Sequence, residues 1–387
     1  MKILVTGAYG FVGKNLCAEL KNIAEGKRRV SPLAGIAPEV MEYDIGCTEE
    51  QLREYCREAE FVVNLAGVNR PQDTAEFGRV NFGFADKLLS LLEEYGNNCP
   101  VLLSSSIQAE LDNPYGVSKR EGERRFFEHG EKTGAEVYVY RFPNVFGKWC
   151  RPNYNSAIAT FCYNTAHGLP IKVNDPTVMM HLVYIDDVVE EILRATAGSP
   201  TREGEFCRVP VQYDRKLGEI AEAITGFAGQ RAGLVIPRVS DPFIKKLYST
   251  FLSYVPAEEA AVPCDKKTDE RGSFTELLRT EDMGQVSVNV CRPGYTKGNH
   301  WHHTKTERFI VVSGSGVIRQ RRIGDDKVTE IPVGGDGILS VDMLPGYTHS
   351  IENTGENDLV FIIWANERFD PERPDTFFEK VLTEDQI

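Results

Sequence analysis

A tyrosine and a lysine four residues apart, Tyr115 and Lys119, are the first pair in the sequence that could do chemistry. Residues at this spacing share one face of a helix, so the amine would lie beside the phenol. A nearby cation favours the phenolate and would lower the pKa of Tyr115, which could then give a proton to a carbonyl oxygen as a hydride reaches the carbonyl carbon. Ser106 closes a Ser-Ser-Ser run and is our candidate for a hydrogen bond to that carbonyl, with Ser105 as the alternative.

A glycine pattern, G-x-x-G-x-x-G, follows the apolar run Ile3–Thr6. Gly7 would allow a tight turn, Gly10 would let the backbone approach a pyrophosphate, and Gly13 would let a helix pack close to the sheet. The N-terminus of that helix would then face the anion. The pattern therefore predicts a dinucleotide site.

Three histidines and a glutamate form a third set: His300, His302, Glu307 and the distant His349. His300 and His302 alternate along a predicted strand, so both would point to one face, and His303 would point to the other. Three imidazoles and a carboxylate make a donor set suited to zinc, iron, manganese or nickel. The sequence therefore predicts a metal site, and these residues alone leave the choice among the four metals open.

Two kinds of domain are needed to position these residues. Up to about residue 240, short apolar strands alternate with amphipathic helices, which predicts a parallel sheet covered on both faces. The strands expected there are Ile3–Thr6, Phe61–Leu65, Val101–Ser104 and Val137–Phe142. From Gly272 onward, short strands punctuated by Gly, Pro and Asn predict an antiparallel barrel or jelly roll. We expect domains at residues 1–250 and 251–387.

Over about residues 1–245 the sequence resembles the extended short-chain dehydrogenase/reductases. The shared segments are the glycine turn, Asn64–Gly67, the Y-x-x-x-K pair and Arg141–Gly147. The resemblance implies an α/β Rossmann domain, an NAD(P) cofactor and the catalytic set Ser106, Tyr115 and Lys119. The cofactor contacts that it implies are Gly7, Tyr9, Gly10, Phe11, Val12, Gly13, Asp44, Leu65, Ala66, Gly67, Ser104, Tyr115, Lys119, Arg141 and Asn144.

Two segments could select between NAD and NADP. An acidic residue after the second strand, such as Asp44, would bind a ribose hydroxyl, whereas an arginine would pair with a 2′-phosphate. Residues 43–50 also look like the adenine-edge segment that these reductases carry one strand later. In that case the basic run of Lys27, Arg28 and Arg29 lies near the second strand, and on this basis we favour NADPH, with NAD as the alternative.

The C-terminal tract resembles the cupins. Residues 294–314 match the spacing of the first cupin motif, and residues 345–353 match the second with the proline one place later. The resemblance implies a jelly-roll barrel that holds a metal through the set named above. Some cupins epimerise sugars without metal, so a metal-free site is the alternative. Arg271 lies in a run similar to the strand entry of sugar-nucleotide 3,5-epimerases and could touch a nucleotide phosphate.

Segments 147–150, 153–156 and 298–305 resemble the bifunctional enzymes of capsular polysaccharide synthesis that make UDP-2-acetamido-2,6-dideoxy-β-L-talose on the route to UDP-N-acetyl-L-fucosamine. The resemblance implies a homodimer whose cupin holds zinc, with another divalent transition metal as the alternative, and epimerises C3 of a UDP-4-keto-6-deoxy-N-acetylhexosamine. The reductase domain then reduces the C4 ketone with NADPH. Asn144, Asn153 and His303 are the implied substrate contacts. The alternative is a 4-ketosugar reductase whose cupin serves only dimerisation or scaffolding.

Composition narrows the range of partners. The net charge of −13 argues against nucleic-acid binding, which needs a basic face. No apolar run approaches the roughly 18 residues of a membrane helix, and the chain opens on a strand-like run, so we expect neither membrane nor signal segment. The nine cysteines are scattered without a C-x-x-C pair, which favours a reducing, cytoplasmic setting.

Overall fold

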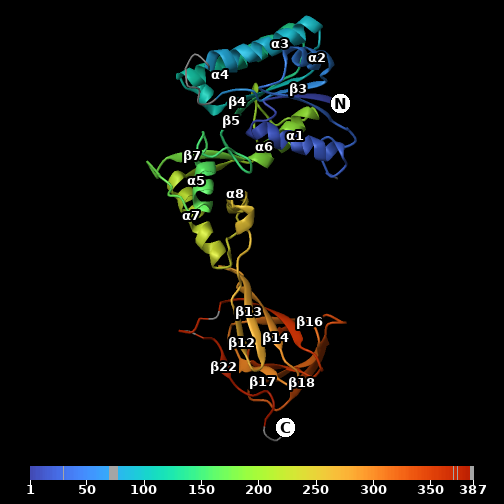
Figure 1. The fold of residues 1–387 in the computed structure, drawn as a ribbon, viewed down its shortest axis with the longest axis vertical. Coiled ribbons are helices and arrows are strands. Elements are labelled where there is room, and N and C mark those ends of the chain that lie inside the picture. The colour runs from blue at the N-terminus through green and yellow to red at the C-terminus, as the bar shows by residue number, and fades with distance from the viewer. Residues whose placement is uncertain (29, 69–76, 369, 373, 384–387) are drawn as a thin grey trace. The chain divides into compact units, whose positions relative to one another are not determined.

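The structure, a computed structural model, describes residues 1–28, 30–68, 77–368, 370–372 and 374–383 (Figure 1). The chain forms two compact units: residues 1–225 with 246–256, and residues 226–245 with 257–387. The expected domain division at residue 250 stays a prediction. None of the described helices is long and apolar enough to cross a bilayer.

The first unit is built on a seven-stranded sheet in the order β2-β1-β3-β4-β5-β9-β8. The strands are β1 (Lys2–Thr6), β2 (Glu39–Tyr43), β3 (Phe61–Asn64), β4 (Val101–Ser106), β5 (Val137–Phe142), β8 (Arg202–Glu203) and β9 (Phe206–Cys207). All neighbours are parallel except β8 and β9. The chain passes from β1 to β2 on one side and returns to β3 on the other. Ligands of such sheets bind at this reversal, outside the carboxyl ends of the strands.

Helices cover both faces of this sheet (Figure 1). They are α1 (Phe11–Ala24), α2 (Glu49–Glu58), α3 (Gly83–Tyr95), α4 (Pro114–Thr133) and α6 (Ile185–Thr196). α2, α3 and α4 lie on one face, where their apolar side chains share a core with β1, β3, β4 and β5, while α1 and α6 lie on the other. Local signals fix their ends: Thr48 and Gln51 form a capping box at α2, and Asn113 caps α4 before a proline at its first position.

A smaller layer completes the first unit beside the carboxyl ends of the strands. Its three-stranded sheet runs β10-β7-β6. The remaining elements up to residue 256 are η1 (Phe77–Phe82), η2 (Ile107–Glu110), β6 (Asn144–Phe146), α5 (Ala157–Ala166), β7 (Met179–Tyr184), β10 (Tyr213–Lys216), α7 (Leu217–Ala232), β11 (Val235–Ile236) and α8 (Pro242–Leu252). The end of α7 and the whole of β11 belong to the second unit, in whose sheet β11 lies next to β13.

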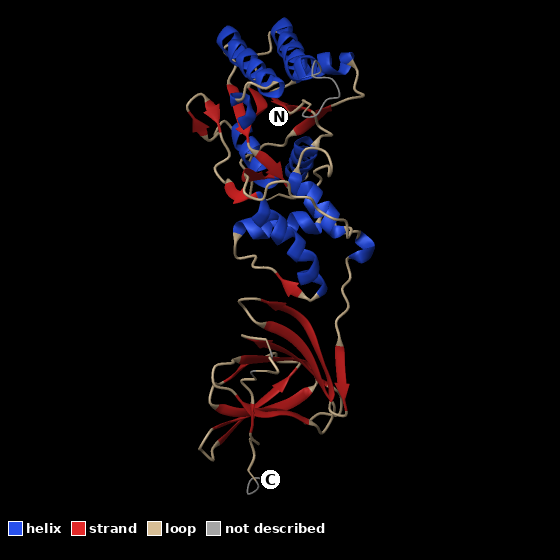
Figure 2. Cartoon of the chain, turned by 90° about the vertical axis from the view of Figure 1, so that its left-hand side faces the viewer, coloured by secondary structure: helices blue, strands red, loops and turns tan. Residues whose placement is uncertain are grey.

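The second unit is β-rich (Figure 2). Its strands are β12 (Lys266–Asp269), β13 (Gly272–Thr280), β14 (Gln285–Cys291), β15 (Thr296–Trp301), β16 (Glu307–Ser313), β17 (Ser315–Arg322), β18 (Val328–Gly334), β19 (Ser340–Met343), β20 (Tyr347–Asn353), β21 (Leu359–Ala365) and β22 (Phe377–Phe378), after the short η3 (Ala257–Glu259). One sheet runs β11-β13-β14-β21-β16-β19, with β12 beside β13, and the other runs β18-β17-β20-β15-β22. Apolar side chains of both sheets form one core. The described strands pair in two open sheets and do not close into a single ladder.

Candidate functional site

The glycine turn forms a cradle between β1 and α1. Gly7 has a left-handed backbone (φ +69), and a Cβ there would lie 2.8 Å from the backbone nitrogen of Ala66. A Cβ on Gly13 would collide with the carbonyl oxygen of Gly7. Gly10 caps α1, so the first backbone N–H groups of that helix are free to bind an anion. The chain thus fits the pyrophosphate of a dinucleotide where the sequence predicts it.

A cavity of about 1430 Å³ extends from this cradle. The predicted residues that line it, the alternative serine included, are Gly7, Tyr9, Gly10, Phe11, Val12, Gly13, Asp44, Leu65, Ala66, Gly67, Ser104, Ser105, Ser106, Tyr115, Lys119 and Asn144. They come from the ends of β1, β2, β3 and β4, the start of α4, and β6. The fold therefore brings together segments that are more than 100 residues apart in the sequence.

The three expected catalytic side chains meet in this cavity. Ser106 ends β4, and its hydroxyl is hydrogen-bonded to that of Tyr115 in the first turn of α4. The Nζ of Lys119 donates to the carbonyl oxygen of Ser104 at 3.1 Å and lies 5.8 Å from the centre of the Tyr115 ring. Ser105 points elsewhere, because its hydroxyl donates to the buried carboxylate of Glu123 at 2.5 Å. Of the two serines, Ser106 is therefore the one placed beside the tyrosine.

The pKa of Tyr115 departs from the expectation. Burial raises it, and the hydrogen bond with Ser106 only partly offsets that rise. Burial also lowers the pKa of Lys119 to about 8, since a half-buried amine loses part of its hydration. The lysine does not offset the effect of burial on the phenol in this structure, and the expected lowering of the Tyr115 pKa is wrong for the protein alone.

Arg141 and Asn153, two of the predicted contacts, do not line the cavity. The guanidinium of Arg141 donates from Nη2 and Nε to Glu123, at 2.6 and 2.9 Å, and stacks 3.9 Å from the centre of the Phe206 ring. The backbone N–H of Asn153 donates to Thr160 in a left-handed turn. These residues support the walls of the site, and no motif in the sequence marks Glu123 as the partner of Arg141.

The ribose edge of the cradle is acidic. Asp44 follows β2, the strand next to β1, and its carboxylate accepts the backbone N–H of Tyr9 at 2.6 Å and that of Ile45 at 2.7 Å. Residues 24–38 contain no strand among those described. In the basic run, Arg28 is bound to Glu19 and Glu190, Lys27 pairs with Glu25, and neither lines the cavity. Arg29 lies outside the described residues.

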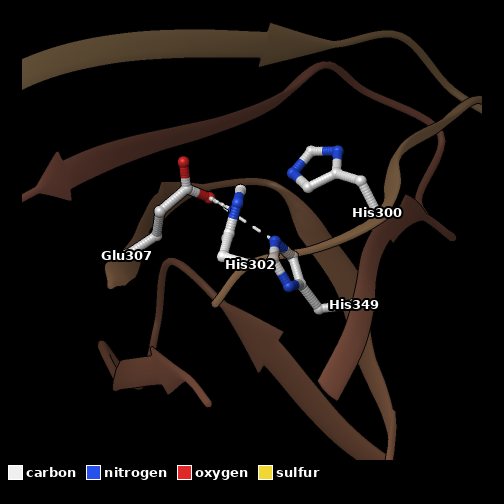
Figure 3. Close-up of side chains that lie close together, drawn as sticks. All are labelled: His300, His302, Glu307 and His349. Atoms are coloured by element: carbon white, nitrogen blue, oxygen red, sulfur yellow. Dashed lines mark ion pairs between the residues drawn. The ribbon is translucent and has the colours of Figure 1, made fainter. Parts of the chain in front are cut away.

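The four predicted ligands of the second unit converge on one point (Figure 3). Their donor atoms all lie within 4.8 Å of one another. His300 pairs directly with His349 on β20, because a β-bulge at Asn299 shifts the register of β15. Glu307 opens β16, and its Oε2 lies 3.6 Å from His302 Nε2 and 3.4 Å from His349 Nε2.

The protonation states and the unpaired ring nitrogens of these four residues suit the binding of a cation. Burial lowers the pKa of His300 to about 4, so its imidazole is neutral. Burial would raise the pKa of Glu307, yet the two histidines and Lys305 bring it well below its usual range. His302 Nε2 and both ring nitrogens of His349 are buried and have no hydrogen-bond partner among the described residues. Orphaned imidazole nitrogens facing a carboxylate fit a metal such as zinc.

His302 is held differently from the prediction. β15 ends at Trp301, so His302 lies in the following loop rather than on the strand. Its Nδ1–H donates to the carbonyl oxygen of Asp375, which leaves Nε2 as the ligand atom. The Asp375 carboxylate also accepts the backbone N–H groups of residues 303, 304 and 305. Asp375 lies 73 residues from His302, and no sequence motif links the two.

His303 and Arg271, the two remaining candidates of the second unit, lie outside the ligand set. His303 packs against Trp301 and Phe377, with ring centroids 4.5 and 5.1 Å away, and it does not line the cavity beside the ligand set. That cavity measures about 400 Å³ and is lined by His300 and Glu307. Arg271 also lines it, with its guanidinium paired to Asp269 at 2.6 Å.

Comparison with known proteins matches both units. Residues 267–377 match the polysaccharide biosynthesis C-terminal domain. A UDP-2-acetamido-2,6-beta-L-arabino-hexul-4-ose reductase of Pseudomonas aeruginosa is 42% identical over 377 residues, which is 97% of this chain and 98% of that protein. The crystal structure of the capsular polysaccharide assembling protein CapF from Staphylococcus aureus has a TM-score of 0.90 at 48% identity, covering 98% of this chain and all of the other.

More distant structures share the N-terminal fold. The UDP-glucuronic acid 4-epimerase of Bacillus cereus, in complex with UDP-glucuronic acid and NAD, superposes with a TM-score of 0.50 at 19% identity over 59% of this chain and 83% of that one. At this identity the likeness shows the fold alone. Residues 3–203 match the profile of the NAD dependent epimerase/dehydratase family, and with the P. aeruginosa relative this shows that the chain belongs to that family.

Proposed function

We propose that this protein reduces the C4 ketone of a UDP-4-keto-6-deoxy-N-acetylhexosamine with a nicotinamide dinucleotide, after epimerisation at C3 by the second unit, to give UDP-2-acetamido-2,6-dideoxy-β-L-talose. The observation that carries the proposal is the placement of Tyr115, Ser106 and Lys119 in one cavity with the glycine cradle. The activity named for the P. aeruginosa relative, reduction of a hexul-4-ose, and the role of CapF in capsular polysaccharide assembly support a ketosugar substrate and a capsule pathway.

In the first unit a bound reduced dinucleotide would supply the hydride. Tyr115 would donate its hydroxyl proton to the ketone oxygen, and Ser106 would orient that oxygen through a second hydrogen bond. Lys119 Nζ lies 5.8 Å from the centre of the Tyr115 ring, and its ammonium group would stabilise the phenolate that remains after the phenol has given up its proton. Asn144 lines the same cavity and is our proposed substrate contact.

For the second unit we propose a cupin whose zinc ligands are His300, His302, Glu307 and His349. A bound zinc ion would polarise a carbonyl oxygen. The ketone at C4 makes the proton at C3 acidic, so polarising that ketone would assist its removal. The residues of this chain would hold the ion, and the second-sphere contact from Asp375 would fix the His302 tautomer.

Dinucleotide oxidation with the 4-ketosugar nucleotide, run with and without a metal chelator, tests the whole proposal. We expect turnover to collapse on chelation. Tyr115→Phe should stop dinucleotide oxidation and leave deuterium exchange at C3, whereas His302→Ala should abolish the exchange. Loss of both activities in each variant, with the fold intact, would contradict separate sites.

Turnover that is unchanged by the chelator would favour the alternative, in which the second unit serves only dimerisation or scaffolding. We also propose a homodimer, and sedimentation of the full chain tests it.

A further inference from the structure

The ribose edge of the cradle carries an anion where NADPH would place its 2′-phosphate. In a sheet with this topology, the residue after the strand beside β1 faces the adenosine ribose. That strand is β2, paired with β1 from Lys2 to Thr6, and the residue after it is Asp44. The Asp44 side chain is fixed in place by the N–H groups of Tyr9 and Ile45. Each carboxylate oxygen keeps a lone pair for a ribose hydroxyl.

Among the described residues, the arginine and lysines closest to Asp44 are paired with carboxylates. The lining residues described at this edge are Tyr9, Asp44, Ile45, Gly46 and Cys47, none of them basic. Arg28, the nearest described arginine of the basic run, is bound by carboxylates on α1 and α6. The sequence-based preference for NADPH depended on that run.

Among the described residues, four basic side chains line the cavity, and one of them, Lys87, lies near Tyr43, the residue before Asp44. Lys87 pairs with Glu49 at 2.7 Å, and Lys119 donates to Ser104 beside the catalytic tyrosine. The Arg151 guanidinium lies 5.5 Å from the centre of the Tyr154 ring. Lys14 follows Gly13 in the first turns of α1, where an ammonium group would meet the pyrophosphate.

Resting on the proposed reductase function, we infer that Asp44 makes this enzyme selective for NADH over NADPH. The carboxylate would accept hydrogen bonds from the 2′- and 3′-hydroxyls of the adenosine ribose. It would repel a 2′-phosphate, because two like charges a few ångströms apart at a half-buried site cost more than an order of magnitude in affinity.

Isothermal titration of the full chain with NADH and with NADPH tests this inference without turnover. We expect NADH to bind at least about tenfold more tightly. Asp44→Asn should weaken NADH binding about tenfold, through loss of a charge-assisted hydrogen bond, and should strengthen NADPH binding. Glu39→Gln, an exposed change at the other end of β2, is the matched control and should leave both affinities unchanged.

Three results would overturn the inference, and they differ from one another. Equal or tighter binding of NADPH refutes the selectivity alone, and a specific loss of that NADPH binding in Lys14→Ala would assign the 2′-phosphate to Lys14. An Asp44→Asn variant that keeps the wild-type ratio would refute the role of Asp44. Failure of both dinucleotides to bind the folded chain would overturn the proposed reductase function together with the inference.

Discussion

Replacing Arg141 by methionine should destabilise the first unit and leave its affinity for the dinucleotide unchanged. The guanidinium makes two hydrogen bonds to the Glu123 carboxylate, and that glutamate is only 4% exposed. Arg141→Met leaves this charge buried with the Ser105 hydroxyl as its one remaining hydrogen-bond partner among the described residues. Breaking a buried ion pair from one side costs about 3–5 kcal/mol, because the remaining ion keeps its desolvation penalty.

A second change should restore much of the loss. Glu123→Gln in the Arg141→Met background removes the charge and keeps an oxygen for Ser105, so we expect a coupling free energy of about 2 kcal/mol between the two sites. Arg124→Met is the matched control, since its partner Glu128 is exposed, and it should cost less than about 0.5 kcal/mol.

Urea unfolding measures these differences in stability. The transition of the first unit is the one that shifts when dinucleotide is added, because a ligand stabilises the domain that binds it. Dinucleotide affinity is measured separately, by titration of the folded protein without urea. The reasoning fails if Arg141→Met costs less than about 1 kcal/mol. It also fails if the variant keeps its stability and loses dinucleotide binding, which would restore Arg141 as a cofactor contact.

Three further predictions address the site. Ser106→Ala should lower kcat about 100-fold, while Ser105→Ala should lower stability with kcat retained; similar kcat losses in both would leave the serine unassigned. Lys119→Met should abolish turnover. It should also raise the free energy of unfolding at pH 7 by at most about 3 kcal/mol, and the melting temperature with it. Its folded pKa of about 8 lies below that of the unfolded chain, so the penalty is fullest below pH 8 and the gain should shrink toward pH 10; a pH-independent gain would contradict this. Asp375→Ala should weaken zinc binding about 10–100-fold by releasing the loop around His302, with Asp375→Asn less affected, and equal affinities by competition with a chelating dye would refute the contact.

Local patterns predicted the scaffold of the first unit well. The strands containing Ile3, Val62, Leu102 and Val139 were recognisable because strands buried on both faces need continuous apolar runs. The glycine cradle was equally visible, since Gly7 and its neighbours meet spacing rules within one turn. The spacing of His300, His302, Glu307 and His349 likewise predicted that these four side chains lie together.

Long-range partners were not predictable. A motif indicates that Arg141 ends a strand, but alternation along that strand cannot say whether a cofactor or Glu123 receives its charge. His302 was assigned to a strand because alternation cannot show where a strand ends, and the carbonyl of Asp375 that orients it comes from a segment without a motif. The bulge at Asn299 inserts one residue into the register, and such an insertion leaves no trace in hydrophobic periodicity.

No strand lies between α1 and β2 among the described residues, and this determines which strand forms the border of the first sheet. β2 is an outermost strand among those described, and it carries Glu39 and Glu42, the latter paired with Lys21 at 2.6 Å. The opposite border, β8, is two residues long and fully polar. Charged or very short border strands resist pairing with a further strand from another molecule. The sheet is thus protected against growing by addition of strands, and self-association of this protein has to use side-chain surfaces instead of backbone hydrogen bonds at those borders.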